Sequence, residues 1–379
     1  MKNKRLKIGI VFNFNPIWMG GIIYIINVIR ILDFLDDDEK PEITLFYRQD
    51  LKTFADQIKY PYLKKIEWKF PSIINGYLKS WLFHKNFFIE DILNQYSLDA
   101  LYPLHDFPVR SDGKVKLVSW YADLQHIYYP NFFSKRKIVE RTLRIKFILK
   151  NTNDLVVSSQ AVADDFKRFF KIRKNMNIHI FHFVSVLENI ENLDIDTLRS
   201  KYKLPEKFFL VSNQFHKHKN HIILLKSLIR LKQTNSDIHI ALTGRFPAAT
   251  YSPYMQELHS LIKENRLEDQ ISFLGIIPRN EQLFLMKHSQ AVIQPSLFEG
   301  WSTVIEDAIS LQVPIIASSL KVNQEQLGST GIYFDPHDEE QLADIIANFP
   351  IRNLSDRFYE EYNTRIKSAA KVFLKILGV

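Results

Sequence analysis

Short apolar runs alternate along this chain with longer stretches in which apolar residues recur every three or four positions. The short runs are typical of buried strands, and the longer stretches are typical of amphipathic helices. Strands that alternate with helices indicate a doubly wound α/β protein with parallel sheets. The pattern predicts strands at residues 7–12, 43–47, 100–102, 116–120, 155–158, 178–181, 208–212, 238–243, 271–274, 291–294, 315–317 and 332–334.

The strands fall into two series, because a polar stretch at residues 187–199 separates the sixth strand from the seventh. A length of 379 residues is long for one hydrophobic core and suits two domains. We therefore predict a first α/β domain at residues 1–190 and a second at residues 191–355. The remainder, residues 356–379, is predicted to be a C-terminal helix.

Composition narrows the class of protein. The chain has no cysteine, which excludes a disulfide framework and fits a reducing compartment. No apolar run approaches the roughly 18 residues that a membrane-spanning helix needs. The opening MKNKRLKIGIVF has a short apolar part without a small-residue cleavage site, so we interpret it as the first strand and not as a signal peptide. These features predict a cytoplasmic protein.

Basic charge is concentrated in the first half of the chain. Residues 1–200 contain 30 Lys and Arg against 23 Asp and Glu, a net charge of +7 out of +8 for the whole chain. Segment 135–150 holds seven basic residues and one acid, and it can lie on an anionic membrane or pack on the sheet with a solvated basic face. Segment 77–93 interleaves aromatic residues with lysines, and it is either a lipid- or acceptor-facing loop or a core helix. In segment 135–150, the apolar residues that would share one face of a helix are Ile138, Val139, Leu143 and Phe147.

The densest candidate chemistry lies at residues 295–318, PSLFEGWSTVIEDAISLQVPIIAS. A loop with Glu299 at its tip follows a predicted strand, and a helix and another strand come next. Ligands of open parallel sheets bind outside the carboxyl ends of the strands, where this loop would lie. A carboxylate beside Trp301 suits sugar hydroxyls and C–H faces. The alternative is structural, because Thr303 and Glu306 form a capping-box pattern that starts a helix without any ligand.

Two further pairs of residues follow predicted strands. Lys217 and Lys219 lie in the first loop of the second domain, where they could meet phosphates as point charges or remain exposed. Gly20 and Gly21 follow the first strand and precede a helix predicted at residues 22–35. The N-terminus of that helix would favour an anion, although a tight turn explains two adjacent glycines more simply.

A histidine is the third candidate in the first domain. The strand at 116–120 leads into a loop with His126, whose imidazole could bond a sugar hydroxyl or assist proton transfer. A structural histidine is the alternative. His105 with Asp106, after the strand at 100–102, is the second choice for the same role.

Segment 295–318 resembles the signature of the family 4 glycosyltransferases, which have the two-domain GT-B fold. The resemblance implies two Rossmann-like, doubly wound domains facing across a cleft, with a C-terminal helix that crosses back to the first domain. The spacing between the two acids is six residues, one fewer than is usual in the family. The matching positions are Glu299, Gly300, Trp301, Glu306, Ala308, Val313, Pro314, Ile316 and Ser318.

The resemblance also implies roles in the second domain. Glu299 would contact the donor sugar, and Glu306 would bind the nucleotide ribose. Lys219 matches a lysine that binds the donor diphosphate. The loop backbone, with Gly300, Trp301, Ser302 and Thr303, would meet the same diphosphate.

Other matches are less specific. The family carries an arginine where this chain has Asn213 or Gln214, so another cation would replace it. The candidates for that replacement are Lys217, His216 and Arg245. Leu274 lies in a loop whose backbone would meet the nucleotide base. In the first domain, Gly20 and Gly21 match a pair that approaches donor phosphate and acceptor, and His126 matches a histidine of the cleft.

The resemblance predicts a retaining glycosyltransferase that needs no metal and no cofactor beyond its nucleotide-sugar substrate. It would move a sugar from a UDP- or GDP-linked donor to a hydroxyl of a saccharide acceptor, as in the assembly of bacterial O-antigen or capsule. A lipid-linked acceptor would bring the protein to the inner face of the cell membrane. Asp194 and Asp196 have the spacing of a metal-binding pair but lie in the polar linker, so we predict no metal site there.

Three alternatives stay open at this point. The same fold serves nucleotide-sugar 2-epimerases, and a non-catalytic sugar-nucleotide-binding partner would carry the same pattern. A net charge of +8 also raises the possibility of a nucleic-acid-binding protein. The chain has no recognised nucleic-acid-binding module and its charge is modest for its length, so we predict no nucleic-acid partner.

Overall fold

The computed structural model describes residues 5–83, 86–104, 114–234 and 237–378. The chain forms two compact units, Met1–Val184 with Glu361–Val379, and Ser185–Glu360. We call them unit 1 and unit 2. The units divide at 184/185 and 360/361, whereas the sequence pattern predicted divisions at 190/191 and 355/356.

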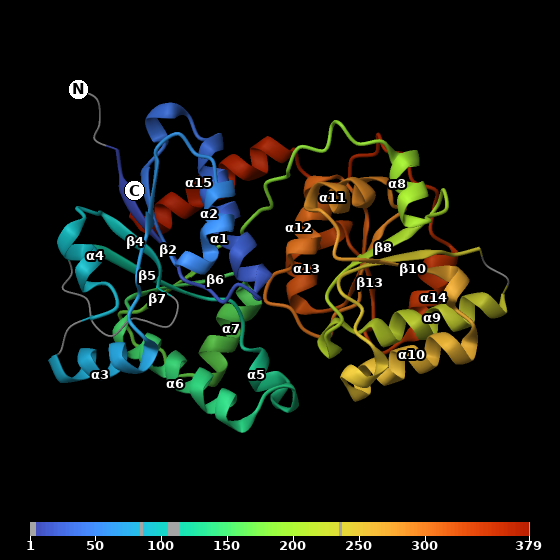
Figure 1. Ribbon diagram of the computed structural model, residues 1–379, viewed down its shortest axis with the longest axis horizontal. Helices are drawn as coiled ribbons and strands as arrows, with labels where there is room; N and C mark the ends of the chain where they lie inside the picture. The colour runs from blue at the N-terminus through green and yellow to red at the C-terminus, as the bar shows by residue number, and fades with distance from the viewer. Residues whose placement is uncertain (1–4, 84–85, 105–113, 235–236, 379) are drawn as a thin grey trace. The chain divides into compact units, whose positions relative to one another are not determined.

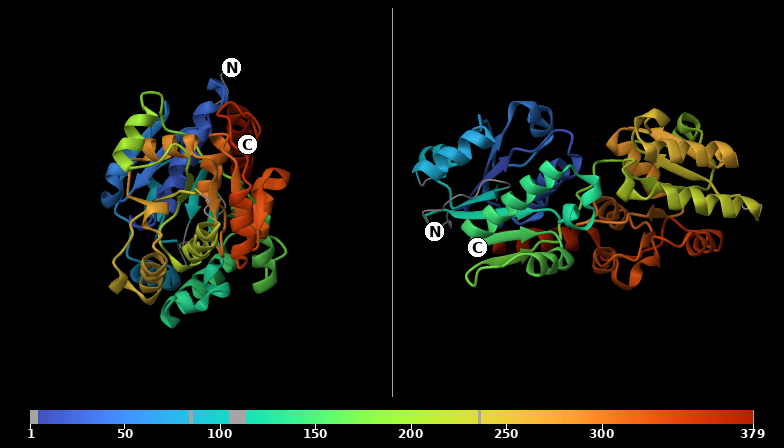
Figure 2. Two further views of the ribbon diagram at one scale, coloured as in Figure 1. Left: turned by 90° about the vertical axis from the view of Figure 1, so that its right-hand side faces the viewer. Right: turned by 90° about the horizontal axis from the view of Figure 1, so that it is seen from below.

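Unit 1 is built on a parallel sheet with the strand order β3-β2-β1-β4-β5-β6-β7. Figures 1 and 2 show helices on both faces of the sheet, so its central strands are buried and read as continuous apolar runs. The strands are β1 (Lys7–Phe12), β2 (Glu42–Tyr47), β3 (Leu63–Glu67), β4 (Ala100–Leu104), β5 (Lys116–Tyr121), β6 (Asp154–Val157) and β7 (Asn177–Ile180). The helices are α1 (Met19–Ile31), α2 (Lys52–Gln57), α3 (Ile73–Phe83), α4 (Glu90–Gln95), α5 (Gln125–Tyr128), α6 (Lys135–Asn151), α7 (Gln160–Phe169) and α15 (Tyr362–Leu377).

The C-terminal helix α15 packs on unit 1, as predicted from the resemblance. Phe373 is fully buried, and its ring centroid lies 5.2 Å from that of Tyr102 and 5.4 Å from that of Phe181. At the surface, Lys367 forms an ion pair of 3.3 Å with Asp36. The helix therefore completes the core of the unit that contains the start of the chain.

Unit 2 repeats the plan with a parallel sheet in the order β10-β9-β8-β11-β12-β13. The strands are β8 (Phe209–Ser212), β9 (Ile240–Thr243), β10 (Ile271–Gly275), β11 (Val292–Gln294), β12 (Ile315–Ser318) and β13 (Ile332–Phe334). The helices are α8 (Ile195–Tyr202), α9 (His221–Gln233), α10 (Pro253–Asn265), α11 (Arg279–His288), α12 (Thr303–Ser310), α13 (Lys321–Leu327) and α14 (Glu339–Ala347).

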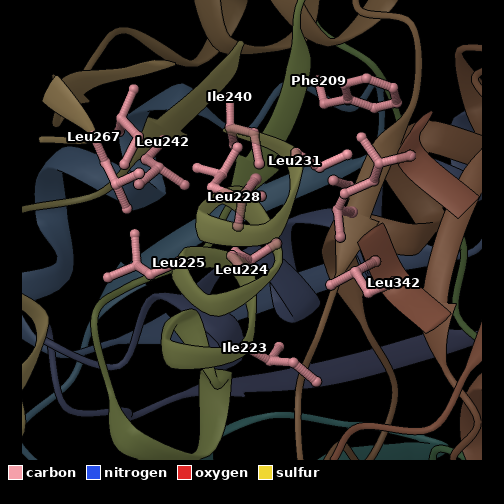
Figure 3. Close-up of a cluster of buried hydrophobic side chains, with 14 of the residues drawn as sticks. Phe209, Ile223, Leu224, Leu225, Leu228, Leu231, Ile240, Leu242, Leu267 and Leu342 are labelled. Atoms are coloured by element: carbon pink, nitrogen blue, oxygen red, sulfur yellow. The ribbon is translucent and has the colours of Figure 1, made fainter. Parts of the chain in front are cut away.

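One core cluster of unit 2 lies between the sheet and helix α9, and another involves helices α8, α11 and α12. Figure 3 shows Leu224, Leu228 and Leu231 of helix α9 in one cluster with Ile240 and Leu242 of strand β9. Spacings of three and four residues place the three leucines on one face of the helix. Each is nearly fully buried, and burying a leucine side chain contributes about 1.5–3 kcal/mol to stability.

All twelve predicted strands are present, with ends that differ by no more than two residues. Strand β3 was missed, because its sequence LKKIE leaves only Leu63 and Ile66 half-buried. It is an edge strand, where charged residues are common and the apolar signal is weak. The polar stretch at 187–199 is also not a linker throughout, because helix α8 begins at Ile195.

Two helices differ from their predicted form. Helix α1 begins at Met19, so Gly20 and Gly21 lie in its first turn and do not precede it. Helix α6 buries Ile145, Ile148 and Leu149. The apolar face predicted from the sequence is therefore not its packing face. The predicted residues Val139, Leu143 and Phe147 are exposed, and Ile138 is half-buried.

Candidate functional site

The candidate site of unit 2 lies where the strand order of the sheet reverses. Strands β8 and β11 are neighbours at the centre, with Leu210 opposite Val292, and later strands are added on both sides. Loops that leave the carboxyl ends of two such strands diverge and open a space for a ligand. The loop after β8 carries Lys219, and the loop after β11 carries Glu299.

Lys219 and Glu299 form an ion pair across this point. The Lys219 Nζ lies 2.5 Å from Glu299 Oε1, and the two side chains are 18% and 10% exposed. Burial alone would raise the pKa of the Glu299 carboxyl, but the charge and hydrogen bond of Lys219 outweigh it and hold that pKa below its ordinary value. Glu299 is therefore an anion at neutral pH, held by one cation from a loop 80 residues away.

Gln294 connects this pair to the sheet. It is fully buried at the end of β11, and its amide nitrogen donates to Glu299 Oε1 over 2.7 Å. Its carbonyl oxygen accepts a 2.9 Å bond from Asn213 Nδ2. Asn213 is thus a buried support for the Gln294 amide. The sequence predicted it as a donor-binding residue, at the position where the family has an arginine. Gln294 itself was not identified from the sequence, because a glutamine that ends an apolar strand carries no motif.

The start of helix α12 is held by a second buried polar group. Ser302 is the N-cap residue, and its hydroxyl accepts a bond from the Ile305 N–H over 3.3 Å. The sequence suggested Thr303 as the cap, which is one residue too late. Glu306 is 1% exposed and accepts a 2.8 Å bond from Gln326 Nε2. Gln326, on α13, also bonds the backbone N–H and C=O of Ser302, at 3.2 and 3.0 Å.

The other residues predicted around this site differ in their exposure to solvent. Gln214, Lys217 and Arg245 are exposed, so each presents its polar group to solvent near the ends of β8 and β9. The Leu274 side chain packs against the core, which leaves only its backbone to meet a ligand. Gly244 is required here, because its φ is +106° and a Cβ would lie 2.6 Å from the Asn213 carbonyl oxygen.

A histidine-rich aromatic cluster adjoins the loop after β8. The His221 ring is fully buried, stacks on Phe215 with centroids 4.2 Å apart, and has no hydrogen-bond partner among the described residues. Burial, with the nearby charge of Lys219, lowers the pKa of His221 to about 3. The same two causes lower the pKa of His218 to about 4. Both rings are neutral at ordinary pH, so Lys219 is the principal cation of this loop beside Glu299.

The corresponding edge of unit 1 is aromatic. The strand order reverses between β1 and β4, and Trp18 lies in the loop after β1. Its ring stacks on Trp120 at 5.7 Å, and Trp120 stacks on Tyr24 at 4.2 Å. A Cβ on Gly21 would lie 2.7 Å from the Trp18 ring, so this glycine lets the indole cover the helix start. That packing role is sufficient to explain Gly21 without a ligand.

His126, the predicted first-domain histidine, lies on α5 and is 1% exposed. Neither ring nitrogen has a hydrogen-bond partner among the described residues. Burial, with a smaller contribution from the charge of Arg141, lowers the pKa of His126 to about 4. The ring is therefore a neutral, buried group, and the sequence had suggested a loop histidine. His105 and Asp106 lie outside the described residues.

Two further sequence expectations concern metals and membranes. Asp194 caps helix α8, its side chain accepting a 2.7 Å bond from the Thr197 N–H, which gives the Asp194–Asp196 pattern a structural explanation. The described ranges contain no group of three or more His, Cys, Asp or Glu placed to hold a metal ion. In the same ranges, none of the helices combines the length and the apolar character needed to cross a membrane.

Comparison with known proteins defines the class. A family model described as glycosyl transferases group 1 matches residues 194–372. The Anabaena protein HepE, solved in complex with UDP and glucose, superposes with a TM-score of 0.64, 18% identity, and coverage of 98% of this chain and 100% of HepE. Residues 194–372 match the group 1 glycosyl transferases, and the whole chain has the GT-B fold. The resemblance predicted from segment 295–318 is thereby confirmed.

Curated relatives agree with this class. The O-antigen chain mannosyltransferase RfbU of Salmonella typhimurium is 27% identical over 239 residues, which are 60% of this chain and 62% of RfbU. A Campylobacter jejuni enzyme is 22% identical over 253 residues, 66% of this chain and 63% of the enzyme. It is the N-acetylgalactosamine-N,N'-diacetylbacillosaminyl-diphospho-undecaprenol 4-alpha-N-acetylgalactosaminyltransferase. The chain matches less than two thirds of the length of each.

Proposed function

We propose that this protein transfers a sugar from a nucleotide-diphosphate donor to a hydroxyl of a saccharide acceptor. The observation that carries the proposal is the Lys219–Glu299 pair at the point where the unit 2 sheet reverses its strand order. A partly buried cation and a partly buried carboxylate at that point suit a ligand that has a diphosphate at one end and sugar hydroxyls at the other. The family match of residues 194–372 supports this class of reaction.

Each polar group then has a distinct task. Lys219 stabilises the charge that develops on the diphosphate as the bond to the sugar breaks. The backbone N–H of Thr303, in the first turn of α12, faces the same charge, whereas the N–H of Ser302 bonds Gln326. Glu299 orients the sugar by accepting bonds from its hydroxyls. Glu306 binds the ribose, and the backbone at Leu274 meets the base. The exposed Lys217 and Arg245 supply the charge of the arginine that the family has near Asn213.

Donor binding would exchange the partners of the Lys219–Glu299 pair. When the diphosphate takes the bond of Lys219, Glu299 loses its cation and gains sugar hydroxyl donors in its place. The Gln294 amide keeps one bond to Glu299 through this exchange and holds the carboxylate in one orientation. We propose that the acceptor hydroxyl then attacks the face that the diphosphate leaves, with retention of configuration and without a metal.

The names of two relatives support a class of acceptor. The names of RfbU and of the Campylobacter enzyme refer to O-antigen and to a diphospho-undecaprenol-linked sugar. We therefore place the acceptor among the saccharides of bacterial surface polysaccharide assembly, carried on a lipid. His126, whose buried ring nitrogens have no bond among the described residues, is our candidate for orienting a hydroxyl.

Thermal unfolding with a panel of nucleotides tests the donor site. UDP, GDP, ADP and dTDP and their sugar conjugates are added with and without EDTA, and the Lys219→Ala variant is run beside Lys226→Ala, an exposed lysine on α9. One nucleotide at about 100 times its dissociation constant adds about 2.7 kcal/mol of stability to the native protein. We expect this gain with EDTA present, in Lys226→Ala, and not in Lys219→Ala. No response to any nucleotide contradicts the assignment.

Incubation of the selected donor with and without a lipid-linked saccharide then tests the reaction. Transfer predicts that the sugar appears on the acceptor and that the donor alone is unchanged. A changed sugar on the nucleotide in the absence of acceptor would identify an epimerase, and binding without any turnover would identify a non-catalytic partner.

A further inference from the structure

Helices α3 and α6 of unit 1 leave large apolar side chains in solvent. The two helices are neighbours, because the ring centroids of Tyr77 and Phe147 lie 5.3 Å apart, and Figure 1 shows them along one edge of the unit. We call the exposed residues of the two helices the α3/α6 face. Its apolar members, with the fraction of each that is exposed, are Ile74 80%, Leu78 53%, Trp81 70%, Leu82 55%, Val139 57%, Leu143 50% and Phe147 43%.

The exposure on α6 is not a consequence of poor packing. Ile145, Ile148 and Leu149 are buried against the unit 1 core and fix that side of the helix. Val139, Leu143 and Phe147 follow one another at intervals of four residues, so they form one stripe on the opposite side. A helix that needed only one apolar face to fold carries a second one that the fold does not use.

Helix α3 has the same arrangement. Gly76 lies against Phe88, and the buried Ser80 hydroxyl accepts a bond from the Phe87 N–H over 3.1 Å, which fixes its inner side. Ile74, Leu78, Trp81 and Leu82 fall together on the outer side at helical spacing. A tryptophan that is 70% exposed is a costly surface residue without a partner, and contiguous exposed apolar side chains usually mark an interaction site.

Positive charge surrounds the apolar stripe of α6. The helix has seven basic residues and one acid, Glu140, which pairs with Lys137 and Arg144. Four other cations of this helix are exposed and make no ion pair with any described residue. They are Lys135, Arg136, Lys146 and Lys150. Interleaved cations and apolar residues on one helix face suit an anionic lipid surface, where the cations meet headgroups and the apolar side chains meet acyl chains.

We propose that the α3/α6 face docks unit 1 on an anionic membrane surface, with the apolar side chains in the interface and the lysines on lipid headgroups. A second copy of this chain is a poorer partner, because a symmetric contact would bring two cationic faces together. The proposal does not rest on sugar transfer, since none of its residues belongs to the candidate donor site. It identifies which part of the protein would meet a lipid-linked substrate.

Vesicle flotation tests the proposal with the full chain. Vesicles of phosphatidylcholine with about 30% phosphatidylglycerol are compared with pure phosphatidylcholine while salt is raised from about 0.05 to about 0.5 M. We expect binding to the anionic vesicles that weakens with salt, and little binding to the neutral ones. Absence of binding to anionic vesicles at low salt overturns the proposal.

Two matched pairs of variants locate the contact. A basic residue near an anionic surface contributes about fivefold to partitioning (about 1 kcal/mol), so K146E with K150E should reduce vesicle binding by about 25-fold or more. The control is K226E with K263E, exposed helix lysines of unit 2. Trp81→Glu should reduce binding about tenfold, and Ile351→Glu, a 70% exposed residue of unit 2, should not. Variants that bind like their controls contradict the α3/α6 face.

Two parallel measurements separate the explanations. Sedimentation equilibrium of the native protein and Trp81→Glu detects self-association, and a dimer that this substitution dissociates would make the face a dimer interface and overturn membrane docking. Nucleotide-dependent thermal shifts of the same variants should equal those of the native protein. Vesicle binding without any nucleotide response would refute the proposed function and leave the docking surface standing.

Discussion

The two units place different chemistry at the carboxyl ends of their parallel strands. In unit 2 this edge is a connected polar network, in which Lys219, Glu299, Gln294 and Asn213 are joined by bonds of 2.5–2.9 Å. In unit 1 it is a stack of aromatic rings, with a buried histidine whose nitrogens have no partner among the described residues. The same topology thus supports a charged site in one unit and an apolar, aromatic edge in the other.

This difference explains why the family pattern is concentrated in unit 2. Each member of a buried polar network needs its partners at fixed distances, because an unpaired buried charge costs several kcal/mol. Few residue types satisfy such a network, so the sequence keeps a specific signature. An aromatic edge can be built in many ways, and it leaves only weak motifs such as two adjacent glycines.

The largest effect should come from removing the cation of the unit 2 network. We expect Lys219→Ala to reduce sugar transfer by about 100-fold or more, since one group that stabilises developing charge is commonly worth that much. Steady-state transfer assays measure the loss, and Lys226→Ala is the matched control. If Lys219→Ala keeps transfer within about threefold of the native rate, another cation stabilises the diphosphate.

The next effect tests unit 1. If His126 orients a hydroxyl, His126→Leu should reduce transfer about 10- to 100-fold while the nucleotide-dependent thermal shift stays unchanged. Stability should not fall, because the ring makes no hydrogen bond with the described residues that leucine would break. Transfer at the native rate in a folded His126→Leu protein would leave this histidine with a purely structural role and direct attention to His105.

A smaller effect should follow from loosening the start of α12. Gln326→Leu removes three hydrogen bonds and leaves the buried Glu306 carboxylate with one donor fewer. We expect a loss of about 1–3 kcal/mol of unfolding free energy and about tenfold weaker nucleotide binding. Chemical denaturation measures the unfolding free energy, and titration calorimetry measures nucleotide affinity. The control is Gln324→Leu, because Gln324 is exposed on the same helix. Nucleotide affinity equal to the control would show that this clamp serves folding only.

The last effect concerns stability alone and depends on pH. The folded-state pKa of His221 is about 3, below its ordinary value of 6.5, so the unfolded chain takes up a proton that the folded one does not. Stability contributed by this group is full above pH 6.5 and falls by about 1.4 kcal/mol per unit as pH drops towards 3. His221→Leu should flatten that slope in thermal melts between about pH 6.5 and 4.5. The exposed His337→Leu should not, and equal slopes in both variants would contradict the buried, neutral ring.

Much of the fold was accessible from local pattern. Strands buried on both faces are continuous apolar runs, which is why twelve strands were predicted close to their true ends. Strand β3 escaped because an edge strand such as LKKIE needs little apolar surface. Helix α6 has two apolar faces, and periodicity alone does not say which one meets the core, so the stripe at Val139, Leu143 and Phe147 could be predicted but its exposure could not.

Local patterns were enough to predict the α/β class, the family resemblance and the two acids of the candidate site, because these depend on periodicity and on residues close together in one segment. Tertiary structure alone decided that Lys219 pairs with Glu299, that Gln294 and Gln326 hold the two acids, and that His126 is buried. Each of these facts is a meeting of segments far apart in the chain or a degree of burial. Both depend on how strands and helices pack, and the spacing of residues along the chain does not predict this packing.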